Sequence, residues 1–563
     1  MAIIQKSLTT FILLLMITTA LIAAETKPKD ESLIVYGGNI LTMDPSNPTT
    51  KAMLISNGII QAVGTMDNLL IISPSSKMYN LQGKTIIPGF IDSHVHVHQL
   101  GAEQIKANLV GADSVKEMVT RLRSFYPNPT IGQWLIGQGW DEGKWASKGY
   151  PDRALLDEAF PNNPIYLQSL HGFASFYNNR ALEIARINEL TADPKVGQIL
   201  KRANGQPTGV FLTLARDLVN KHIPEASVEE RKRAIIAGLN LMASAGVTTV
   251  HEAGIGKKNL QAFLELKEAD QLPIRVYGFL DGNDETLMKK MFKEGPILDP
   301  EHQLTIRGIK IYYDGSLGSR TALLRKPYSD EPSKANMTER ITPERVASLA
   351  DRAIKHKFQL AVHAIGDEAN DRVLNIFTKA INGDKNIDHR WRIEHAQVVL
   401  PNYYQRVVEM GVISSMQSSH AVGDSGWAED RLGKKRIQRA YAWQNILETG
   451  GRLIINSDLP GEPWRPEQTL HFAVTRQNLN DQPPAGWYPK QRLSIMTALK
   501  AMTSEPAYAA FQEDVLGSLK VGMLADFVIL DKDLRNIPES KIKQLNVLST
   551  WLNGKKIWSS SMH

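Results

Sequence analysis

The sequence contains no cysteine in its 563 residues. This absence excludes disulfide bonds, thiolate metal ligands and a cysteine nucleophile, so any bound metal must be held by nitrogen and oxygen atoms. A lipid anchor on an N-terminal cysteine is excluded for the same reason. A secreted eukaryotic protein without cysteine is unusual, whereas a periplasmic protein tolerates the absence.

The sequence also lacks a strong charge of either sign. Its 65 lysine and arginine residues and 59 acidic residues leave a formal net charge of +6. The sequence has no run of lysine and arginine residues suited to binding along a phosphate backbone, so we expect no nucleic-acid partner. The composition, with 42% apolar and 22% charged residues, is that of a folded protein. The length exceeds what one hydrophobic core usually organises.

The N-terminus has the pattern of an export signal. Residues 8–24 are almost wholly apolar or hydroxylic, and Ala20, Ala23 and Ala24 place small residues before a polar segment. We predict that residues 1–24 are a signal peptide and that the mature chain is periplasmic or secreted. The alternative is an uncleaved anchor, because the apolar run reaches the lower limit of a membrane span. Cleavage leaves no stable membrane insertion.

Both ends of the mature chain are rich in short β segments broken by Asn-Gly or Gly-Gly turns. These segments are residues 32–42, 52–63, 517–530 and 547–558. They predict one small β-sandwich domain assembled from residues 25–85 and 512–563. Two unrelated surface hairpins are the alternative.

The middle of the chain, residues 86–511, alternates short apolar strands with amphipathic segments. Predicted strands include residues 247–251, 306–312, 359–363, 391–395, 411–417 and 452–456, and predicted helices include 228–245 and 343–356. This α/β alternation favours a parallel (β/α) barrel. A doubly wound sheet is the alternative, but no glycine-rich phosphate fingerprint follows the first strand. Residues 99–245 are too long for one unit and predict an insertion over the barrel mouth.

The first barrel strand ends in histidines, in PGFIDSHVHVH at residues 88–98. Residues two apart in a strand point to the same side, so His94 and His96, or His96 and His98, present two imidazoles to one point. Histidine is the commonest metal ligand, which favours a metal site. A surface pair or an internally hydrogen-bonded pair is the alternative.

Four later polar residues close apolar strands in the same way. They are Lys310, His363, His395 and Asp458. Taken singly, the lysine is more often in a salt bridge and a strand-end histidine is often only hydrogen-bonded. Taken together, they place ligands at the carboxyl ends of successive strands, and that rim of a barrel is where active sites form.

This ordered set resembles the amidohydrolase superfamily, and in finer detail its amidohydrolase family 3 branch, which includes N-substituted formamide deformylases. The resemblance spans residues 32–532. The motifs that carry it, besides PGFIDSHVH, are GWDEGKW, PTGVF, GVTTVHEAG, KIYYDGSLGSRTALL, AVHAIGDEAND, RIEHAQ, INSDLP and LGSLKVGMLADFVILD.

The resemblance implies a (β/α)8 TIM barrel with a β-sandwich built from both chain ends, and one or two divalent metals. It implies that His94 and His96 bind the buried metal. Lys310, carboxylated on its amine, would bridge two metals, and His363 and His395 would hold the second. Asp458 would bind metal and accept a proton. Zinc suits these ligands, with manganese, iron and cobalt as alternatives.

Five further residues are candidates for substrate binding, each with a structural alternative. Trp140, His171, Asp314, Arg320 and Gln417 either face the substrate or serve packing, loop order and hydrogen bonding. The chain departs from the family pattern at His171, where many relatives read Asp-Gly-His and this chain reads His-Gly-Phe. That change weakens any transfer of substrate identity.

The function these observations predict is hydrolysis of a non-peptide carbon–nitrogen bond in an amide, imide or N-formyl small molecule by metal-activated water. An esterase, lactonase or phosphoesterase at the same centre is one alternative, and a catalytically silent exported binding protein is another. The expected partner is a small-molecule substrate, and a homodimer stays open as an alternative to a monomer.

Overall fold

The computed structural model describes residues 32–146, 149–170, 172–333, 339–384 and 386–561. The predicted signal peptide, residues 1–24, therefore lies outside the described residues. The chain divides into two compact units. The terminal unit comprises the described residues within Met1–Ile91, Gly246–Thr248 and Ser494–His563, and the barrel unit comprises those within Asp92–Ala245 and Thr249–Leu493.

The terminal unit contains one eight-stranded sheet that takes strands from both ends of the chain. Its strands are β1 (Leu33–Leu41), β2 (Thr49–Ser56), β3 (Ile59–Gly64), β4 (Lys77–Asn80), β5 (Thr85–Pro88), β20 (Phe527–Leu530), β21 (Val547–Leu552) and β22 (Lys555–Ser559). The two ends join where β5 pairs with β20 in antiparallel register. The hairpins close at Asn57-Gly58 and Asn553-Gly554, whose positive φ angles suit the tight turns between twisted strands.

The helices α2 (Met66–Ile72), α18 (Ile495–Ala501) and α19 (Ser504–Ala509) also belong to the terminal unit. The predicted boundary at residue 511 therefore differs from the structural one at Ser494. The reason is packing, because Ile91, Ala507 and Leu516 form one buried cluster within this unit.

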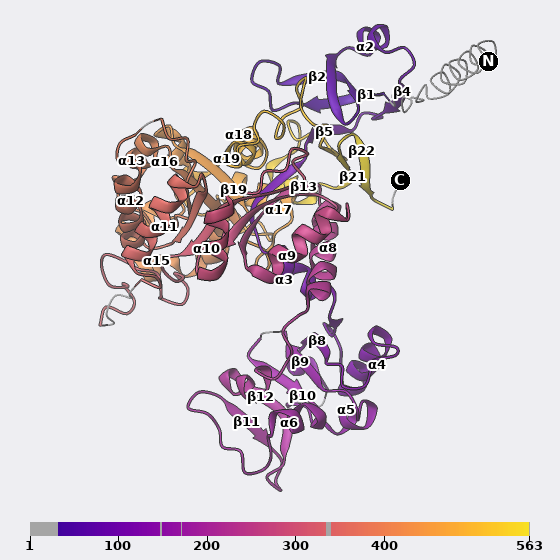
Figure 1. Cartoon of the computed structure of the whole chain (residues 1–563), viewed down its shortest axis with the longest axis vertical. Helices are drawn as coiled ribbons and strands as arrows, with labels where there is room; N and C mark the ends of the chain where they lie inside the picture. The colour runs from indigo at the N-terminus through magenta and orange to yellow at the C-terminus, as the bar shows by residue number, and fades with distance from the viewer. Residues whose placement is uncertain (1–31, 147–148, 171, 334–338, 385, 562–563) are drawn as a thin grey trace, which may run out of the picture. The chain divides into compact units, whose positions relative to one another are not determined.

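The barrel unit is built on eight parallel strands. They are β6 (Phe90–Val95), β13 (Val247–Ile255), β14 (Arg275–Asp281), β15 (Leu304–Tyr312), β16 (Gln359–Ala364), β17 (Arg392–His395), β18 (Ile413–Gln417) and β19 (Arg452–Asn456), with neighbours in chain order. Figure 1 labels β13 and β19 among them. A parallel bridge from Val95 to Leu459 links the first strand to the segment after the last. The predicted α/β barrel with a β domain from both chain ends is confirmed.

The helices of the barrel unit lie between or after these strands, and three of them begin at a residue whose side chain caps the helix. They are α3 (Val97–Gln104), α8 (Val228–Ser244), α9 (Lys257–Glu268), α10 (Glu285–Glu294), α11 (Pro343–Lys355), α12 (Asp367–Ile381), α13 (Tyr403–Met410), α14 (Ser418–Gly423), α15 (Ala428–Arg436), α16 (Trp443–Glu448) and α17 (Pro466–Thr475). Ser227 and Glu230 form a capping box on α8. Gly411 ends α13 in a left-handed conformation, so β18 begins two residues later than the sequence pattern predicts.

The insertion folds as its own α/β layer. A six-stranded sheet contains β7 (Ala107–Asn108), β8 (Leu135–Trp140), β9 (Ile165–Ser169), β10 (Ala174–Tyr177), β11 (Gln198–Lys201) and β12 (Pro207–Leu212). The helices α4 (Val115–Phe125), α5 (Ala154–Ala159) and α6 (Asn179–Ala185) lie between its strands in the sequence, and α7 (Asp217–Asn220) follows the last strand. Two buried clusters of its own side chains form its core.

No helix among the described residues is both long enough and apolar enough to cross a membrane.

Candidate metal centre

The carboxyl ends of the barrel strands bring six predicted ligands to one cleft of about 330 Å³. These residues are His94 from β6, His96 directly after it, Lys310 from β15, His363 from β16, His395 at the end of β17, and Asp458 two residues beyond β19. Parallel pairing places the strand ends at the same rim, which is why residues so far apart in sequence meet there.

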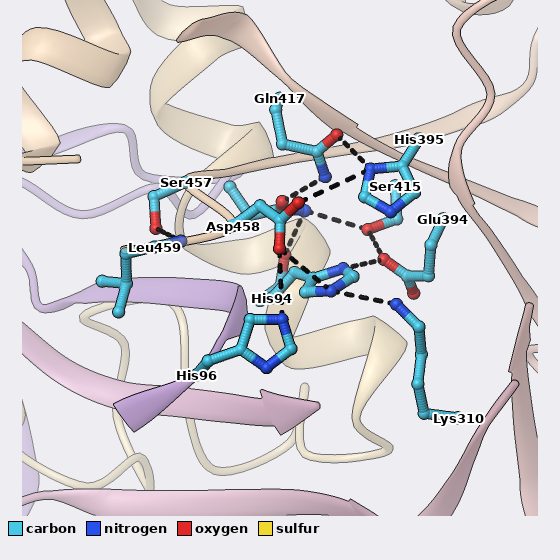
Figure 2. A network of polar contacts seen from close by, with 12 residues as sticks. His94, His96, Lys310, Glu394, His395, Ser415, Gln417, Ser457, Asp458 and Leu459 are labelled. Atoms are coloured by element: carbon cyan, nitrogen blue, oxygen red, sulfur yellow. Dashed lines mark hydrogen bonds and ion pairs between the residues drawn. The ribbon is translucent and has the colours of Figure 1, made fainter. Parts of the chain in front are cut away.

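The backbone between the first and last strands sets the position of Asp458 (Figure 2). The amide of Asp458 donates to the carbonyl of His94 over 2.9 Å, and the amide of His96 donates to the carbonyl of Leu459 over 3.1 Å. As a result, Oδ1 of Asp458 lies 3.4 Å from Nε2 of both His94 and His96. Asp458 has φ +56°, a left-handed backbone that is uncommon outside glycine and often marks functional sites.

Three of the histidines have one ring nitrogen held by a hydrogen-bond acceptor. Nδ1 of His94 lies 2.6 Å from Oε2 of Glu394. Nδ1 of His395 lies 2.8 Å from Oε1 of Gln417, and Nε2 of His363 lies 3.1 Å from the carbonyl oxygen of Gly315. Each contact fixes the proton on that nitrogen and leaves a lone pair on the other, as metal-ligating histidines require.

Burial keeps these imidazoles neutral. Desolvation, with the Lys310 charge as the next cause, lowers the pKa of His94 and lowers that of His363 to about 3. Desolvation and the neighbouring His363 lower the pKa of His395 well below its ordinary value. Burial raises the pKa of Asp458, but the surrounding histidines outweigh burial and hold it well below its usual range. The centre thus presents neutral nitrogens beside an ionised carboxylate.

These donors fit a divalent cation. The lone pair of His94 Nε2 and Oδ1 of Asp458 are both acceptors, so their 3.4 Å separation cannot be a hydrogen bond between them. Ligand atoms of His94, His395 and Asp458 all lie within 4.8 Å of one another. A metal ion among such nitrogen and oxygen atoms satisfies acceptors that otherwise face each other.

Lys310 lies at the base of the same cluster. Its Nζ is 3.1 Å from Nε2 of His94 and 4.6 Å from the centre of the Tyr312 ring. The side chain is buried, and desolvation lowers the pKa of its amine to about 8. A substantial fraction of the amine is therefore neutral near physiological pH, which is the form that reacts with carbon dioxide.

A buried polar network supports the histidines from behind. Glu394 accepts a hydrogen bond from Ser415 Oγ at 2.5 Å and pairs with Nε of Arg392 at 2.7 Å. Burial raises the pKa of Glu394, but Arg392 and His94 outweigh it and hold the pKa well below its ordinary value. Gln417 donates from Nε2 to Asn456 over 2.7 Å, so that its oxygen is left to face His395.

The residues predicted to bind substrate have other contacts in the structure. None of Trp140, Asp314, Arg320 and Gln417 lines the cleft. Trp140 is fully buried in the core of the insertion, where its Nε1 donates to the carbonyl of Leu167. His171 lies outside the described residues. None of the described cleft-lining residues comes from residues 99–245, so the expected role of the insertion at the mouth is not confirmed.

The other three residues predicted to bind substrate form hydrogen bonds or ion pairs with other protein groups. Asp314 accepts hydrogen bonds from the amides of Leu323, Ile365 and Gly366, each at 2.9 Å, and so orders the loop after β15. Arg320 is paired with Asp330 at 2.9 Å. Gln417 orients His395, as described above.

The sequence pattern did not single out the outer wall of the cleft. Asp424, Trp427 and Glu462 line it. Asp424 and Trp427 come from the segment between α14 and α15, and Glu462 comes from the loop after β19. They do not close apolar strands, so no period-two pattern marks them. Their only sequence signal is a position in βα loops, which carry function in barrels.

The comparisons with known proteins agree with this geometry. The family model described as amidohydrolase family matches residues 77–557. This chain belongs to the amidohydrolase family. The predicted membership is thereby confirmed.

Individual relatives cover nearly the whole chain. The protein LONG AFTER FAR-RED 3 of Arabidopsis thaliana is 34% identical over 93% of this chain and 91% of its own length. N-substituted formamide deformylase of Arthrobacter pascens is 26% identical over 93% of this chain and 97% of its own length. An uncharacterized metal-dependent hydrolase from Pyrococcus horikoshii OT3 is 27% identical, with a TM-score of 0.73 over 90% of this chain and 99% of that one. Together these findings support a metal-dependent hydrolase.

Proposed function

We propose that this amidohydrolase-family chain hydrolyses a non-peptide carbon–nitrogen bond of an amide, imide or N-formyl small molecule. The observation that carries the proposal is the set of oriented, neutral histidines around the ionised Asp458 in an open cleft. The name of the formamide deformylase relative supports the N-formyl class in particular.

The proposed ligands are His94, His96, His363, His395, Asp458 and Lys310. A divalent metal bound among them supplies Lewis acidity toward water and toward the substrate carbonyl. We propose zinc, because nitrogen and oxygen donors without thiolate suit it. We also propose that Lys310 is carboxylated, since its buried amine has a pKa of about 8.

The chain's own residues handle the protons. Asp458 is ionised and lies at the open side of the cluster, so it accepts the proton of the attacking water. The same carboxyl then delivers that proton to the departing nitrogen. His420 lines the cleft beside this carboxylate, with Nε2 3.8 Å from Oδ2 of Asp458 and Nδ1 3.2 Å from Nε2 of Gln397.

An activity panel tests the proposal. Metal-loaded protein is assayed against matched N-formyl, N-acyl and cyclic imide compounds, together with carboxylic esters, lactones and phosphoesters of similar size. We expect hydrolysis within the carbon–nitrogen group. Turnover confined to the esters, lactones or phosphoesters contradicts the proposed carbon–nitrogen specificity and supports hydrolysis of that other bond class. No turnover of any compound supports a catalytically silent binding protein.

We further propose that the chain is exported. The proposal is based on the apolar segment at residues 8–24 and the alanines at its end. N-terminal sequencing of the protein from fractionated cells decides this. A mature N-terminus near Glu25 outside the cytoplasm supports export, and an intact Met1 in the membrane fraction supports the anchor.

A further inference from the structure

The outer wall of the cleft carries negative charge without a permanent cationic partner. Among the described lining residues, Lys310 is the only lysine or arginine, and it lies within the cluster of predicted ligands. Asp424, between α14 and α15, and Glu462, in the loop after β19, line the same cleft. The two carboxyl groups are close enough that the charge of Glu462 raises the pKa of Asp424.

Glu462 has an open carboxylate. Within the described part of the chain, it forms no hydrogen bond or ion pair with a protein group. A methyl group placed on Gly423 would lie 3.4 Å from both of its oxygens, so the carboxylate rests against that backbone. Burial raises its pKa, and the only counteracting charge is that of His420. A half-buried carboxylate without a hydrogen-bond partner is stabilised when a cation or a strong hydrogen-bond donor binds to it.

Asp424 is held in place at the same wall. The hydroxyl of Tyr441 donates to its Oδ2 over 2.5 Å. Burial raises the pKa of Asp424 to about 6, and His420 is the only positively chargeable group that opposes this rise. Asp424 is therefore mostly ionised at neutral pH, so two negative charges share this end of the cleft.

Trp427 adds a flat, apolar ring to the lining of the same cleft. The tip of its ring lies against Gly318, where a methyl group would be 3.3 Å from Cη2. Arg431 lies over the Trp427 ring at 5.3 Å, but its guanidinium is paired with Asp330 and does not line the cleft. An indole beside carboxylates is a surface that suits an alkylammonium group, through its methylenes and its charge.

We propose that Glu462, with Asp424 and Trp427, selects substrates that carry an ammonium group on the side remote from the bond that is cleaved. This inference rests on the proposed function and narrows its substrate class to cationic amides. For an N-formyl diamine, water adds to the formyl carbon and the carbon–nitrogen bond breaks. The formyl group leaves as formate and the nitrogen takes up a proton, so the products are formate and the free diamine.

A matched pair of compounds isolates the charge. N-(aminobutyl)formamide and N-pentylformamide have chains of the same length and differ in an ammonium or a methyl group at the far end. Metal-loaded wild type should have the lower KM for the cationic compound. Glu462→Gln should raise that KM roughly ten- to a hundred-fold, as expected for one charge-assisted hydrogen bond, and leave the KM of the neutral compound unchanged. Glu448→Gln, an exposed carboxylate on α16, is the control that should change neither.

Binding of the product amines separates this inference from the proposed function. Calorimetry with diaminobutane and pentylamine needs no turnover, and the diamine should bind wild type more tightly by a margin that Glu462→Gln abolishes. If neither formamide is hydrolysed but this margin is present, N-formyl hydrolysis fails and the cation site stands. Equal binding of the two amines, or a margin that survives in Glu462→Gln, overturns the cation site whatever the activity.

Discussion

Nδ1 of His94 lies 2.6 Å from Oε2 of Glu394, although the two residues are 300 positions apart in the sequence. The contact fixes the proton on Nδ1 and turns Nε2 toward Asp458. Glu394 is in turn paired with the buried Arg392. The imidazole of His94 on β6 is thus oriented by the carboxylate of Glu394 on β17. The first prediction tests this orienting contact.

Glu394→Gln should weaken metal binding by roughly ten- to a hundred-fold, the usual cost of losing a partner that orients a ligating histidine. Gln keeps the shape but lacks the charge that favours the Nδ1 proton. Titration of metal-free protein against a competing chelator measures the change, with Glu448→Gln as the matched surface control. Loss of the ion pair with Arg392 should also lower the free energy of unfolding of the metal-free variant, because the arginine charge is left buried and unpaired. An unchanged metal affinity contradicts the orienting role.

Asp458→Asn should reduce turnover far more than it reduces metal content. The amide keeps the shape and an oxygen ligand but cannot accept the proton of water, and general acid–base catalysis contributes about 10²–10⁴-fold. We therefore expect kcat to fall by that order while at least one metal stays bound. Metal analysis and kinetics are made on the same preparation. A metal-loaded Asn variant with nearly normal kcat refutes the catalytic role and leaves Asp458 as a loop anchor.

Lys310 should capture carbon dioxide during metal loading. Its amine has a pKa of about 8, so its neutral fraction, and with it the rate of loading at a fixed concentration of dissolved carbon dioxide, should rise as the pH approaches about 8 and level off above it. Magnetic resonance with isotope-labelled bicarbonate should detect a carbamate in wild type and none in Lys310→Ala. The variant should also bind one equivalent of metal fewer. A wild type without the carbamate signal, and with metal content equal to that of the variant, shows that Lys310 is unmodified.

The sequence pattern predicted the inner centre better than its surroundings, for physical reasons. His94, His363 and His395 close apolar strands, and the parallel barrel obliges such strand ends to meet. The sequence alone assigns no partner to Glu394, because the partner of a carboxylate near a strand end is known only after folding. Glu462 was missed because a loop has no periodicity from which its direction follows. The separate sheet of the insertion was not predicted either, and Trp140 suggested a substrate contact where the structure has a core.

A substitution of Trp140 distinguishes a role in core packing from a contact with the substrate. The Trp140 ring is fully buried in the insertion, so Trp140→Ala should lower the free energy of unfolding by about 3–5 kcal/mol and leave KM unchanged in the protein that remains folded. Urea unfolding and steady-state kinetics give the two quantities. Trp140→Phe is the conservative control and should cost less. A raised KM with unchanged stability supports the substrate contact instead.

The central claim is that the strand-end residues form a metal centre, and metal content tests it most directly. Purified wild type and the double variant His94→Ala with His96→Ala are compared by elemental analysis after identical exposure to zinc and removal of loosely bound ions. We expect one to two equivalents in wild type and the loss of most of that metal in the variant, with a lower thermal stability because ligand binding stabilises the folded state. Equal metal content in the two folded proteins contradicts the assignment of the site.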